Sequence, residues 1–238
     1  MRAKLDDAKT RDITFPGHRV IISPEGEFWI AFFRNAPPKG EKLTVVFPDG
    51  QILEHPFEVE PREFEEEKID GLPESFIKMD PKTKVRHAKI HARIDKRRMG
   101  YDKSLHCKGD WAWPAKGKIT SRYGYERTLN GTDGGIHWGI DIAAGVGTPV
   151  EAPCGGKVVA VEKDVPLAGN TLVLDHGQGL TSTFIHLSAF RAKVGDMVKT
   201  GDVIAAVGNT GRSTGPHLDW RMNLFEVRVD PELLVPPM

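Results

Sequence analysis

The chain has 238 residues, of which 33 are lysine or arginine and 33 are aspartate or glutamate, so its formal net charge is zero. This balance leaves no basic excess that would attract nucleic acid, and a hydrophobic fraction of 39% is typical of a folded protein rather than a disordered one. No run of 18 apolar residues is present, so we expect no membrane span. The first residues, MRAKLDDAKTRD, lack the apolar stretch of a secretory signal. The protein is therefore either cytosolic or an exported protein whose leader is not part of this sequence.

The two cysteines, Cys107 and Cys154, fit neither a zinc knuckle nor a CxxC redox pair. We expect two separate, small side chains that are buried or half-buried. A single disulfide is the alternative, and it would require an oxidising compartment.

Short β-branched and aromatic runs follow one another in the first quarter of the chain. The turn sequences PEG, NAPPKG and PDG separate these runs, which predicts a small antiparallel β domain. The expected strands lie within RVIIS, EFWIAFF, LTVVF and QILEHPFEV.

The charge then changes sign along the chain. Residues 54–67 hold seven acidic side chains and one basic one, whereas residues 82–103 hold nine basic side chains and two acidic ones. Such runs are typically solvated faces or partners of each other, and a surface for an anionic polymer is the alternative. His87 and His91 are four residues apart in the basic run, so a helix would place them on one face. We expect no metal there, because no third ligand accompanies them and the surrounding charge is positive.

From Trp111 onward the sequence consists of short β runs, each bounded by glycine. KVVAVE, NTLVLDH, LTSTFIHLS and VIAAVG are the expected strands. We place a domain boundary near residue 105. The prediction is an all-β protein with an N-terminal β domain and basic linker over residues 1–105 and a second domain over residues 106–238.

Five polar residues of the second half form a candidate site: His137, Asp141, His186, His217 and Asp219. Zinc binds imidazole and carboxylate donors in tetrahedral geometry, with one position open for water in an enzyme. His217 and Asp219 are separated by one residue, so a strand would place both on the same face. Imidazoles beyond the ligand set are suited to proton transfer near neutral pH. Spacing alone leaves open that these are structural histidines.

Four stretches over about residues 111–235 resemble one known family. They are WPAKGKITSRYG, IHWGIDIAAGVGTPVEAPCGGKVV, GNTLVLDHGQGLTSTFIHLS and VKTGDVIAAVGNTGRSTGPHLDW. In this order they are similar to the lysostaphin/LytM-type zinc metallopeptidases, which cleave peptidoglycan cross-bridges. The resemblance implies an antiparallel β-sheet peptidase domain with an open groove and one zinc ion per chain. It assigns His137 and Asp141 to the metal, and His186 and His217 to catalysis.

The last metal ligand of that family is the second histidine of Gly-Pro-His-Leu-His, and Asp219 stands at this position. A carboxylate also binds zinc, at about 2.0–2.2 Å, so we favour a conservative ligand exchange. Two carboxylates make the centre less positive and weaken its effect on the acidity of bound water. The alternative is a catalytically degenerate domain that binds peptidoglycan or activates an amidase.

The resemblance also implies a location and a substrate. The N-terminal half, including GLPESFIKMDP, is similar to the small β domain that precedes this peptidase in proteobacterial envelope enzymes. This implies the periplasm or cell envelope, a D-alanyl-diaminopimelate cross-link, and peptide stems as partners, with other cell-wall enzymes as further candidates. The N-terminal domain would recognise substrate or regulate the site. Arg122 and Tyr123 are candidates to line the groove, and Asn130 is a candidate to lie over the metal.

A carrier-protein reading rests on VGDMVKTGDVIAAVGNTG, which is similar to the hammerhead of biotinyl and lipoyl domains. Lys163 is the nearest attachment lysine, but it lacks the expected surroundings. The sequence also contains neither HExxH nor GxSxG, which excludes two other common hydrolase classes.

Overall fold

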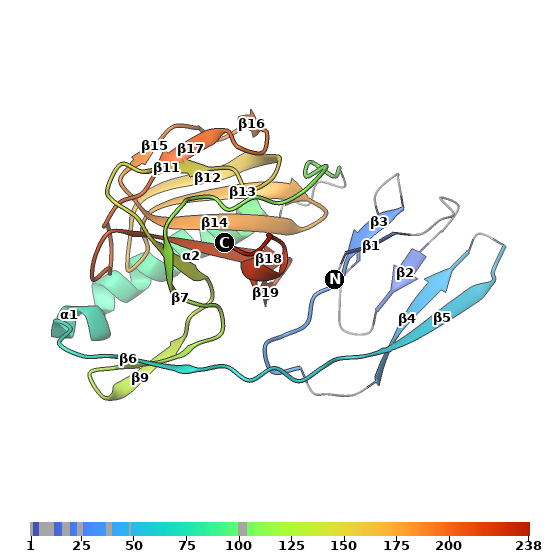
Figure 1. Ribbon diagram of the computed structural model, residues 1–238, viewed down its shortest axis with the longest axis horizontal. Coiled ribbons are helices and arrows are strands. Elements are labelled where there is room, and N and C mark those ends of the chain that lie inside the picture. Colours follow the sequence, from blue (N-terminus) through green and yellow to red (C-terminus); the bar gives the residue numbers. More distant parts are fainter. Residues whose placement is uncertain are drawn as a thin grey trace.

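The computed structural model shows a small group of strands beside a larger β-sheet body (Figure 1). The structure is mostly β, as the sequence predicts, and helices are a minor part of what is described. The described residues are 2–4, 12–15, 20–22, 26–36, 40–47, 49–99 and 104–238.

A large antiparallel sheet forms the centre of the C-terminal body. Its long strands come from the glycine-bounded β-branched runs that predicted them, and each residue of the strand Leu180–Leu187 is buried. The strand order is β16 (Met197–Val198), β12 (Gly156–Val165), β13 (Gly169–Gly177), β14 (Leu180–Leu187), β18 (His217–Leu224), β10 (Ile140–Ala143) and β7 (Lys118–Ser121), with β19 (Val227–Val229) also paired to β18.

One face of this sheet carries the main hydrophobic core. Trp220, Phe184, Ile140, Ile142 and Leu172 are all inaccessible to solvent within it. A second, three-stranded sheet adds to this core, and a short 3₁₀ helix, η1 (Pro231–Leu233), follows the last strand. The strands of the second sheet are β11 (Pro149–Glu151), β17 (Val203–Ala206) and β15 (Ala189–Phe190).

Cys107 and Cys154 form a disulfide, so the expectation of two separate cysteines is wrong. The backbone N–H of His106 donates to the carbonyl of His176 at 2.9 Å, which holds the Cys107 loop against β13. The two Cα atoms are 5.3 Å apart although 47 residues separate them in sequence. The fold brings the two cysteines together, and their separation in the sequence does not indicate that they are close.

The N-terminal strands form two small sheets. They enclose a separate core that includes Phe15, Phe28 and Val45. In the stretch RVIIS (residues 19–23), where we expected a strand, the structure describes residues 20–22, and these lie outside any strand. The strands are β1 (Arg2–Lys4) paired with β3 (Glu27–Trp29), and β2 (Asp12–Thr14), β4 (Gly40–Val46) and β5 (Ile52–Glu58) in that order.

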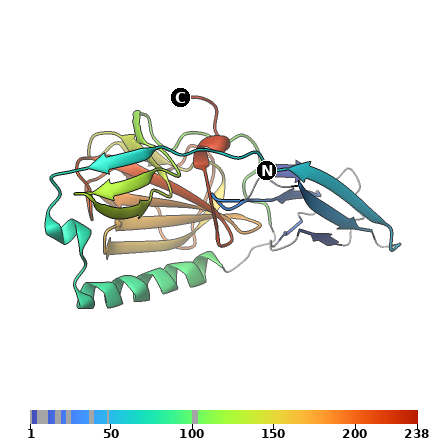
Figure 2. The same ribbon diagram turned by 90° about the horizontal axis from the view of Figure 1, so that it is seen from below.

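After β5 the chain crosses to the C-terminal body as an extended segment, which Figure 2 shows running along it. Strand β6 (Glu66–Ile69) pairs in parallel with β8 (Glu126–Leu129), and β9 (Thr132–Ile136) completes this sheet. A single helical turn, α1 (Glu74–Ile77), follows β6. We call residues 66–77 the strap.

The basic run forms helix α2 (Pro81–Arg98), which lies along the C-terminal body (Figure 2). Asp80 caps its first turn by accepting hydrogen bonds from the N–H groups of Lys82 and Thr83. Ile90 and Ile94 are buried against β12 and β13. Because these two residues are the buried positions of the helix, α2 is attached to the sheet by a narrow apolar stripe.

The acidic and basic runs are not partners of each other. Arg93 and Arg97 of α2 bind Glu162 of β12, while Glu67 of the acidic run binds Arg127. Among the described residues no ion pair joins one run to the other.

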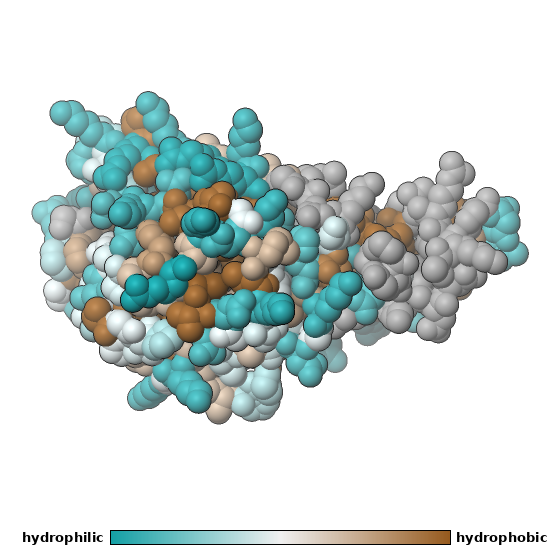
Figure 3. Space-filling model, turned by 90° about the horizontal axis from the view of Figure 1, so that it is seen from above, coloured by the Kyte–Doolittle hydropathy of each residue, from teal (hydrophilic) through white to brown (hydrophobic). Residues whose placement is uncertain are grey.

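The surface seen from above is mostly hydrophilic, with hydrophobic residues gathered in patches near the middle of the C-terminal body (Figure 3). In the part of the chain that is described, no helix has the length and apolar character needed to cross a membrane.

Candidate active site

Three neighbouring strands place their polar side chains in one row. Asp141 of β10 lies opposite Asp219 of β18 on one side and opposite Ser121 of β7 on the other. Because side chains alternate along a strand, His217, Asp219 and Arg221 share one face of β18, and the residues between them enter the core. The strand register therefore brings both candidate acidic ligands together.

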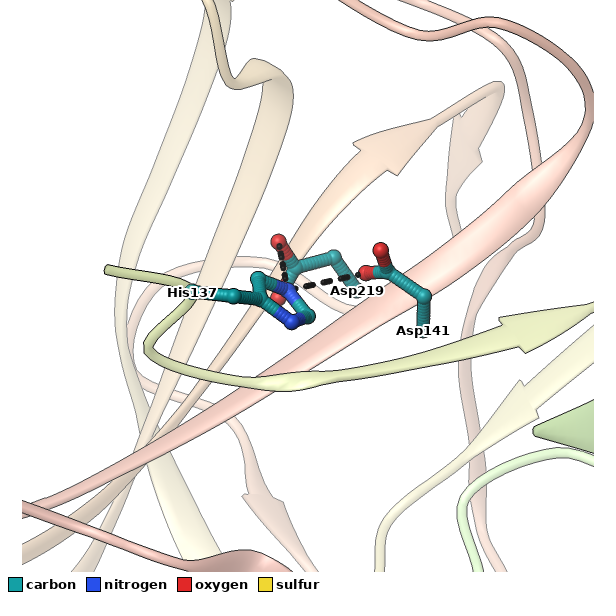
Figure 4. Close-up of side chains that lie close together, drawn as sticks. All are labelled: His137, Asp141 and Asp219. Atoms are coloured by element: carbon teal, nitrogen blue, oxygen red, sulfur yellow. Dashed lines mark hydrogen bonds and ion pairs between the residues drawn. The ribbon is translucent and has the colours of Figure 1, made fainter. Parts of the chain in front are cut away.

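His137, in the connection between β9 and β10, points at both carboxylates (Figure 4). Its Nε2 lies 3.1 Å from Asp141 Oδ1 and 3.4 Å from Asp219 Oδ2. Its Nδ1 lies 3.1 Å from the carbonyl oxygen of Arg122, which only accepts hydrogen bonds, so Nδ1 carries the proton. Nε2 is therefore the atom that faces the carboxylates. Burial opposes the charged ring, but the two acids raise the pKa of His137, so without a metal Nε2 donates its proton to them. Once that proton is lost, the fixed ring has the arrangement usual for a metal-bound histidine.

These three residues fit a divalent cation. Their ligand atoms all lie within 4.8 Å of one another. Asp141 Oδ1 is buried and has no hydrogen-bond partner in the described structure. Donor atoms on a tetrahedral zinc ion are about 3.3 Å apart, which matches the separations of 3.1 and 3.4 Å around His137 Nε2. A divalent cation between these atoms would replace the proton on His137 Nε2 and bind all three ligand atoms.

Two arginines neutralise the carboxylates from outside. Arg127 Nη2 donates to Asp141 Oδ2 at 2.8 Å, and Arg221 donates to Asp219 through Nε at 2.9 Å and Nη2 at 2.6 Å. Burial opposes the ionisation of both acids, but Arg221 and His137 hold the pKa of Asp219 well below its ordinary value. Likewise, burial and Asp219 oppose ionisation of Asp141, yet His137 and Arg127 lower its pKa. Both acids are therefore ionised at neutral pH.

Gly139 makes room for the Asp219–Arg221 pair. A Cβ atom at this position would lie 2.3 Å from Asp219 Oδ1 and 2.7 Å from Arg221 Cγ. The absence of a side chain in the His-Trp-Gly-Ile-Asp stretch thus allows the backbone before β10 to pass directly over the ion pair.

The strap contributes one residue to the same network. Glu67 Oε2 accepts a hydrogen bond from Arg127 Nε at 2.6 Å and another from Ser121 Oγ at 2.9 Å. Arg127 is thus shared by Glu67 and Asp141. The charge around the candidate ligands is set partly by a residue from the N-terminal half.

His186 reaches the site through a break in the strand pattern. Ile185 pairs with Asp219, so regular alternation would send His186 to the opposite face of β14. The pairing of β13 with β14 shifts register between Asn170 and Leu172, and His186 has a φ of 62°. This bulge in the left-handed region turns its ring towards His217, and the two ring centroids are 4.7 Å apart.

The two histidines are oriented alike. His186 Nδ1 lies 2.7 Å from the carbonyl oxygen of Thr210, and His217 Nδ1 lies 2.8 Å from that of Gly215. Each Nδ1 therefore carries a proton, which leaves Nε2 as the atom of each ring that can exchange a proton in the groove. His217 Nε2 is 3.7 Å from Asp141 Oδ1. Burial lowers the pKa of His186 to about 4, so its ring is neutral at pH 7.

A groove of about 460 Å³ opens over these residues. Its lining combines Asp141, Asp219, His186 and His217 with residues of the strap and α2, while His137 is buried behind it. The contributions from outside the ligand set include Leu72, Phe76, His87, His91 and Arg212.

The three candidate substrate residues are not brought into this groove. The Arg122 side chain forms an ion pair with Glu232, and the Tyr123 hydroxyl is held in the interior, donating to the carbonyl of Arg228 at 3.0 Å. Burial raises the pKa of Tyr123 to about 12. Neither side chain lines the groove, because the end of β7 turns both towards η1 and β19.

Asn130 is also placed away from the candidate metal ligands. Its side chain receives a hydrogen bond from the Leu72 N–H at 3.0 Å and donates to the Leu72 carbonyl at 2.8 Å. It fastens the strap to the β8–β9 turn, so the expectation that it covers the metal is not met.

Comparison with known proteins agrees with this geometry. Residues 135–231 match peptidase family M23. Lysostaphin from Staphylococcus staphylolyticus is 41% identical over 100 residues, covering 42% of this chain and 21% of lysostaphin. Peptidoglycan DD-endopeptidase ShyB from Vibrio cholerae is 43% identical over 94 residues, covering 40% of this chain and 22% of the relative. The chain thus spans about a fifth of the length of these relatives.

A crystal structure assigned to peptidase M23 from Pseudomonas aeruginosa covers 98% of this chain and 92% of its own, with 27% identity and a TM-score of 0.74. The chain therefore carries an M23 peptidase domain of the lysostaphin and LytM type. Its similarity to a solved structure extends over the N-terminal half as well.

Sequence reasoning missed the charged partners of the ligands. Arg221 carried a usable signal, because it stands two residues after Asp219 on a strand and must share its face. Glu67, Arg127 and Arg212 carried none, because strand pairing and loop packing alone bring them to the groove.

Proposed function

From an M23 peptidase domain with this arrangement of ligands, we propose that the chain is a zinc-dependent endopeptidase that hydrolyses peptide cross-links of bacterial peptidoglycan. The observation that carries the proposal is the convergence of three metal-ligand atoms from His137, Asp141 and Asp219, with Asp141 Oδ1 buried 3.1 Å from His137 Nε2. His137, Asp141 and Asp219 would hold the ion. When bound, zinc acts as a Lewis acid that polarises the scissile carbonyl and increases the acidity of water.

The proton transfers of hydrolysis fall to His186 and His217. Amide hydrolysis needs a base that accepts a proton from the attacking water and an acid that returns a proton to the leaving amine. Both rings line the groove with their Nδ1 atoms fixed by backbone carbonyls, so each Nε2 is the atom available for proton transfer. Fixed rings need no reorientation during the reaction, which favours catalysis.

Arg221 explains how aspartate can replace histidine at position 219. A His-His-Asp set with zinc carries a net charge of one, whereas a His-Asp-Asp set with zinc is neutral. The guanidinium of Arg221 on Asp219 adds one positive charge and restores the first value. Glu67 and Arg127 cancel each other in the same sum. We therefore favour an active site over a degenerate one.

The second candidate is a non-catalytic domain that binds peptidoglycan or activates an amidase. The observation that favours it is that arginines already occupy both carboxylates. In this case the ion pairs would replace the metal rather than tune it.

Metal analysis together with hydrolysis tests the proposal. Purified protein should contain about one zinc ion per chain and should cleave cross-linked muropeptides. Chelation should abolish cleavage and added zinc should restore it. His137→Ala should lose zinc, while His55→Ala, an exposed histidine on β5, should retain it. Cleavage that persists after complete removal of metal would overturn the zinc assignment, and a loaded but inactive protein would favour the second candidate.

We also propose that the protein acts in the periplasm or cell envelope. The Cys107–Cys154 disulfide supports this, because such bonds persist in oxidising compartments. We retain a division of the chain near residue 105, with the first part recognising substrate or regulating the site. The strap and α2 belong to that part, and they supply one side of the groove.

A further inference from the structure

Arg212 is a cation built into the groove on a fixed loop between β17 and β18. Its backbone N–H donates to the carbonyl of Leu167 at 2.7 Å. Gly211, just before it, has a φ of 76°, and a Cβ atom there would lie 2.4 Å from the backbone nitrogen of Gly169. The same loop supplies the Thr210 carbonyl that orients His186. The half-buried Arg212 side chain is therefore held beside a candidate catalytic residue.

Unlike the other arginines of the groove, Arg212 has no acidic partner among the residues that the structure describes. Arg127 binds Glu67 and Asp141, and Arg221 binds Asp219. The guanidinium of Arg212 donates through Nη1 to the carbonyl of Phe76 at 2.8 Å, and within the described ranges no carboxylate lies within 4.0 Å of it.

The electrostatic surroundings of Arg212 are unfavourable in the free protein. Burial, followed by the positive charges of Arg127 and Arg221, lowers its pKa. A guanidinium has five N–H donors, and one is used in the described structure. A cation held in this way is stabilised when an anion enters the groove.

We propose that Arg212 anchors a subsite for a free carboxylate of the peptide substrate. The inference rests on the proposed peptidase function and narrows its substrate class to peptides that carry a carboxylate near the scissile bond. A guanidinium binds a carboxylate through two parallel N–H···O bonds, which gives orientation as well as affinity. His91 lines the same groove, and its Nε2 is buried without a hydrogen-bond partner in the described structure.

A purely structural role for Arg212 makes a different prediction. If its function were to fasten the strap through Phe76, substitution would slow the cleavage of all substrates by the same factor. Arg212→Gln keeps an N–H donor for the Phe76 carbonyl and removes the charge. Arg86→Gln is the matched control, because Arg86 also donates to one backbone carbonyl, that of Asp164, at 2.8 Å, and it lies outside the groove.

The test compares cross-linked peptide dimers with their carboxylates free and with each carboxylate converted in turn to a primary amide. For wild type and Arg86→Gln, amidation of one carboxylate should lower kcat/KM about 10- to 100-fold, the effect of losing one charge-assisted interaction. Arg212→Gln should abolish this preference, and Arg212→Lys should restore part of it. Equal rates for free and amidated peptides in wild type, or an unchanged preference in Arg212→Gln, would overturn the inference.

A binding measurement separates this inference from the proposed function. Calorimetry on the full chain in chelator, where a zinc peptidase does not turn over, gives the affinity ratio of the free and amidated peptides. A protein that cleaves no dimer but shows an Arg212-dependent ratio refutes the peptidase and retains the subsite. A protein that cleaves free and amidated dimers alike retains the peptidase and refutes the subsite.

Discussion

Replacing Arg221 with glutamine removes the cation that neutralises Asp219. The Asp219 side chain is 2% exposed and that of Arg221 is 27% exposed, so the pair is largely withdrawn from solvent. Removing one partner of a buried ion pair costs about 3–5 kcal/mol, and the partial exposure of Arg221 places the expected loss near the lower value. For a protein of this size, about 3 kcal/mol corresponds to a decrease in Tm of roughly 6–12 °C in the metal-free protein.

Zinc should reverse this loss. Without the Arg221 guanidinium the site carries one positive charge less, and the oxygens of Asp219 lose their charged N–H donors. We expect zinc affinity to rise roughly 10- to 100-fold, the value of one charge-assisted hydrogen bond. The increase in Tm on adding zinc should therefore be larger for Arg221→Gln than for wild type. The less positive loaded centre should also move the acidic limb of the pH–rate profile to higher pH.

Thermal melts with and without zinc, together with a competition titration against a chromogenic chelator, measure both effects. Arg93→Gln is the matched control, because Arg93 forms a similar two-bond pair with Glu162 at 2.8 and 2.6 Å while its side chain is 49% exposed. It should cost less than about 1 kcal/mol and leave zinc affinity unchanged. If zinc stabilises Arg221→Gln no more than wild type, charge compensation at position 219 is refuted.

Three further changes test other parts of the structure. Glu67→Gln should weaken zinc binding about 10-fold in the same chelator titration, because Arg127 would then form its ion pair with Asp141 alone and compete more strongly with zinc for that carboxylate. An unchanged zinc affinity would contradict this. Replacing Cys107 and Cys154 with serine should lower the free energy of unfolding, measured by urea denaturation, by about 4 kcal/mol, the loop-closure entropy of a 47-residue separation. Adding reductant should then lower the stability of the wild type and leave that of the variant unchanged. Burial lowers the pKa of His176 to about 4, so below pH 6.5 the unfolded chain binds a proton that the folded protein does not. The free energy of unfolding should therefore fall by roughly 3 kcal/mol as pH decreases from about 6.5 to 4. The same pH dependence of stability in His176→Gln would contradict this.

The C-terminal strands were predictable because their local pattern and their final environment agree. The runs that became β12, β13 and β14 of the large sheet and β17 of the three-stranded sheet are β-branched, bounded by glycine and contribute buried residues to the core. Helix α2 was not predicted. Its buried positions are Ile90 and Ile94, and its other surface is charged, so its apolar periodicity is weak. The helix depends on contact with β12 and β13, which a local pattern does not report.

The candidate site was predictable to different degrees for different residues. Asp219 and His217 follow from strand alternation, and Arg221 follows from the same rule. His186 contradicts that rule, because the bulge at the end of β14 turns it to the other face. Its candidate role came from the family resemblance and not from periodicity.

The region that matches the peptidase family does not contain the whole charge network. Residues 135–231 hold the candidate ligands and both histidines, whereas Glu67 and Arg127 lie outside that range. Arg127 divides its donors between Glu67 and Asp141, so the loss of Glu67 would leave a mostly buried guanidinium with one carboxylate. Arg127 would then bind the Asp141 carboxylate more strongly, and zinc would bind that carboxylate more weakly. A chain beginning after residue 104 would thus keep each candidate ligand and bind the ion more weakly, because the strap relieves the competition between arginine and metal for Asp141.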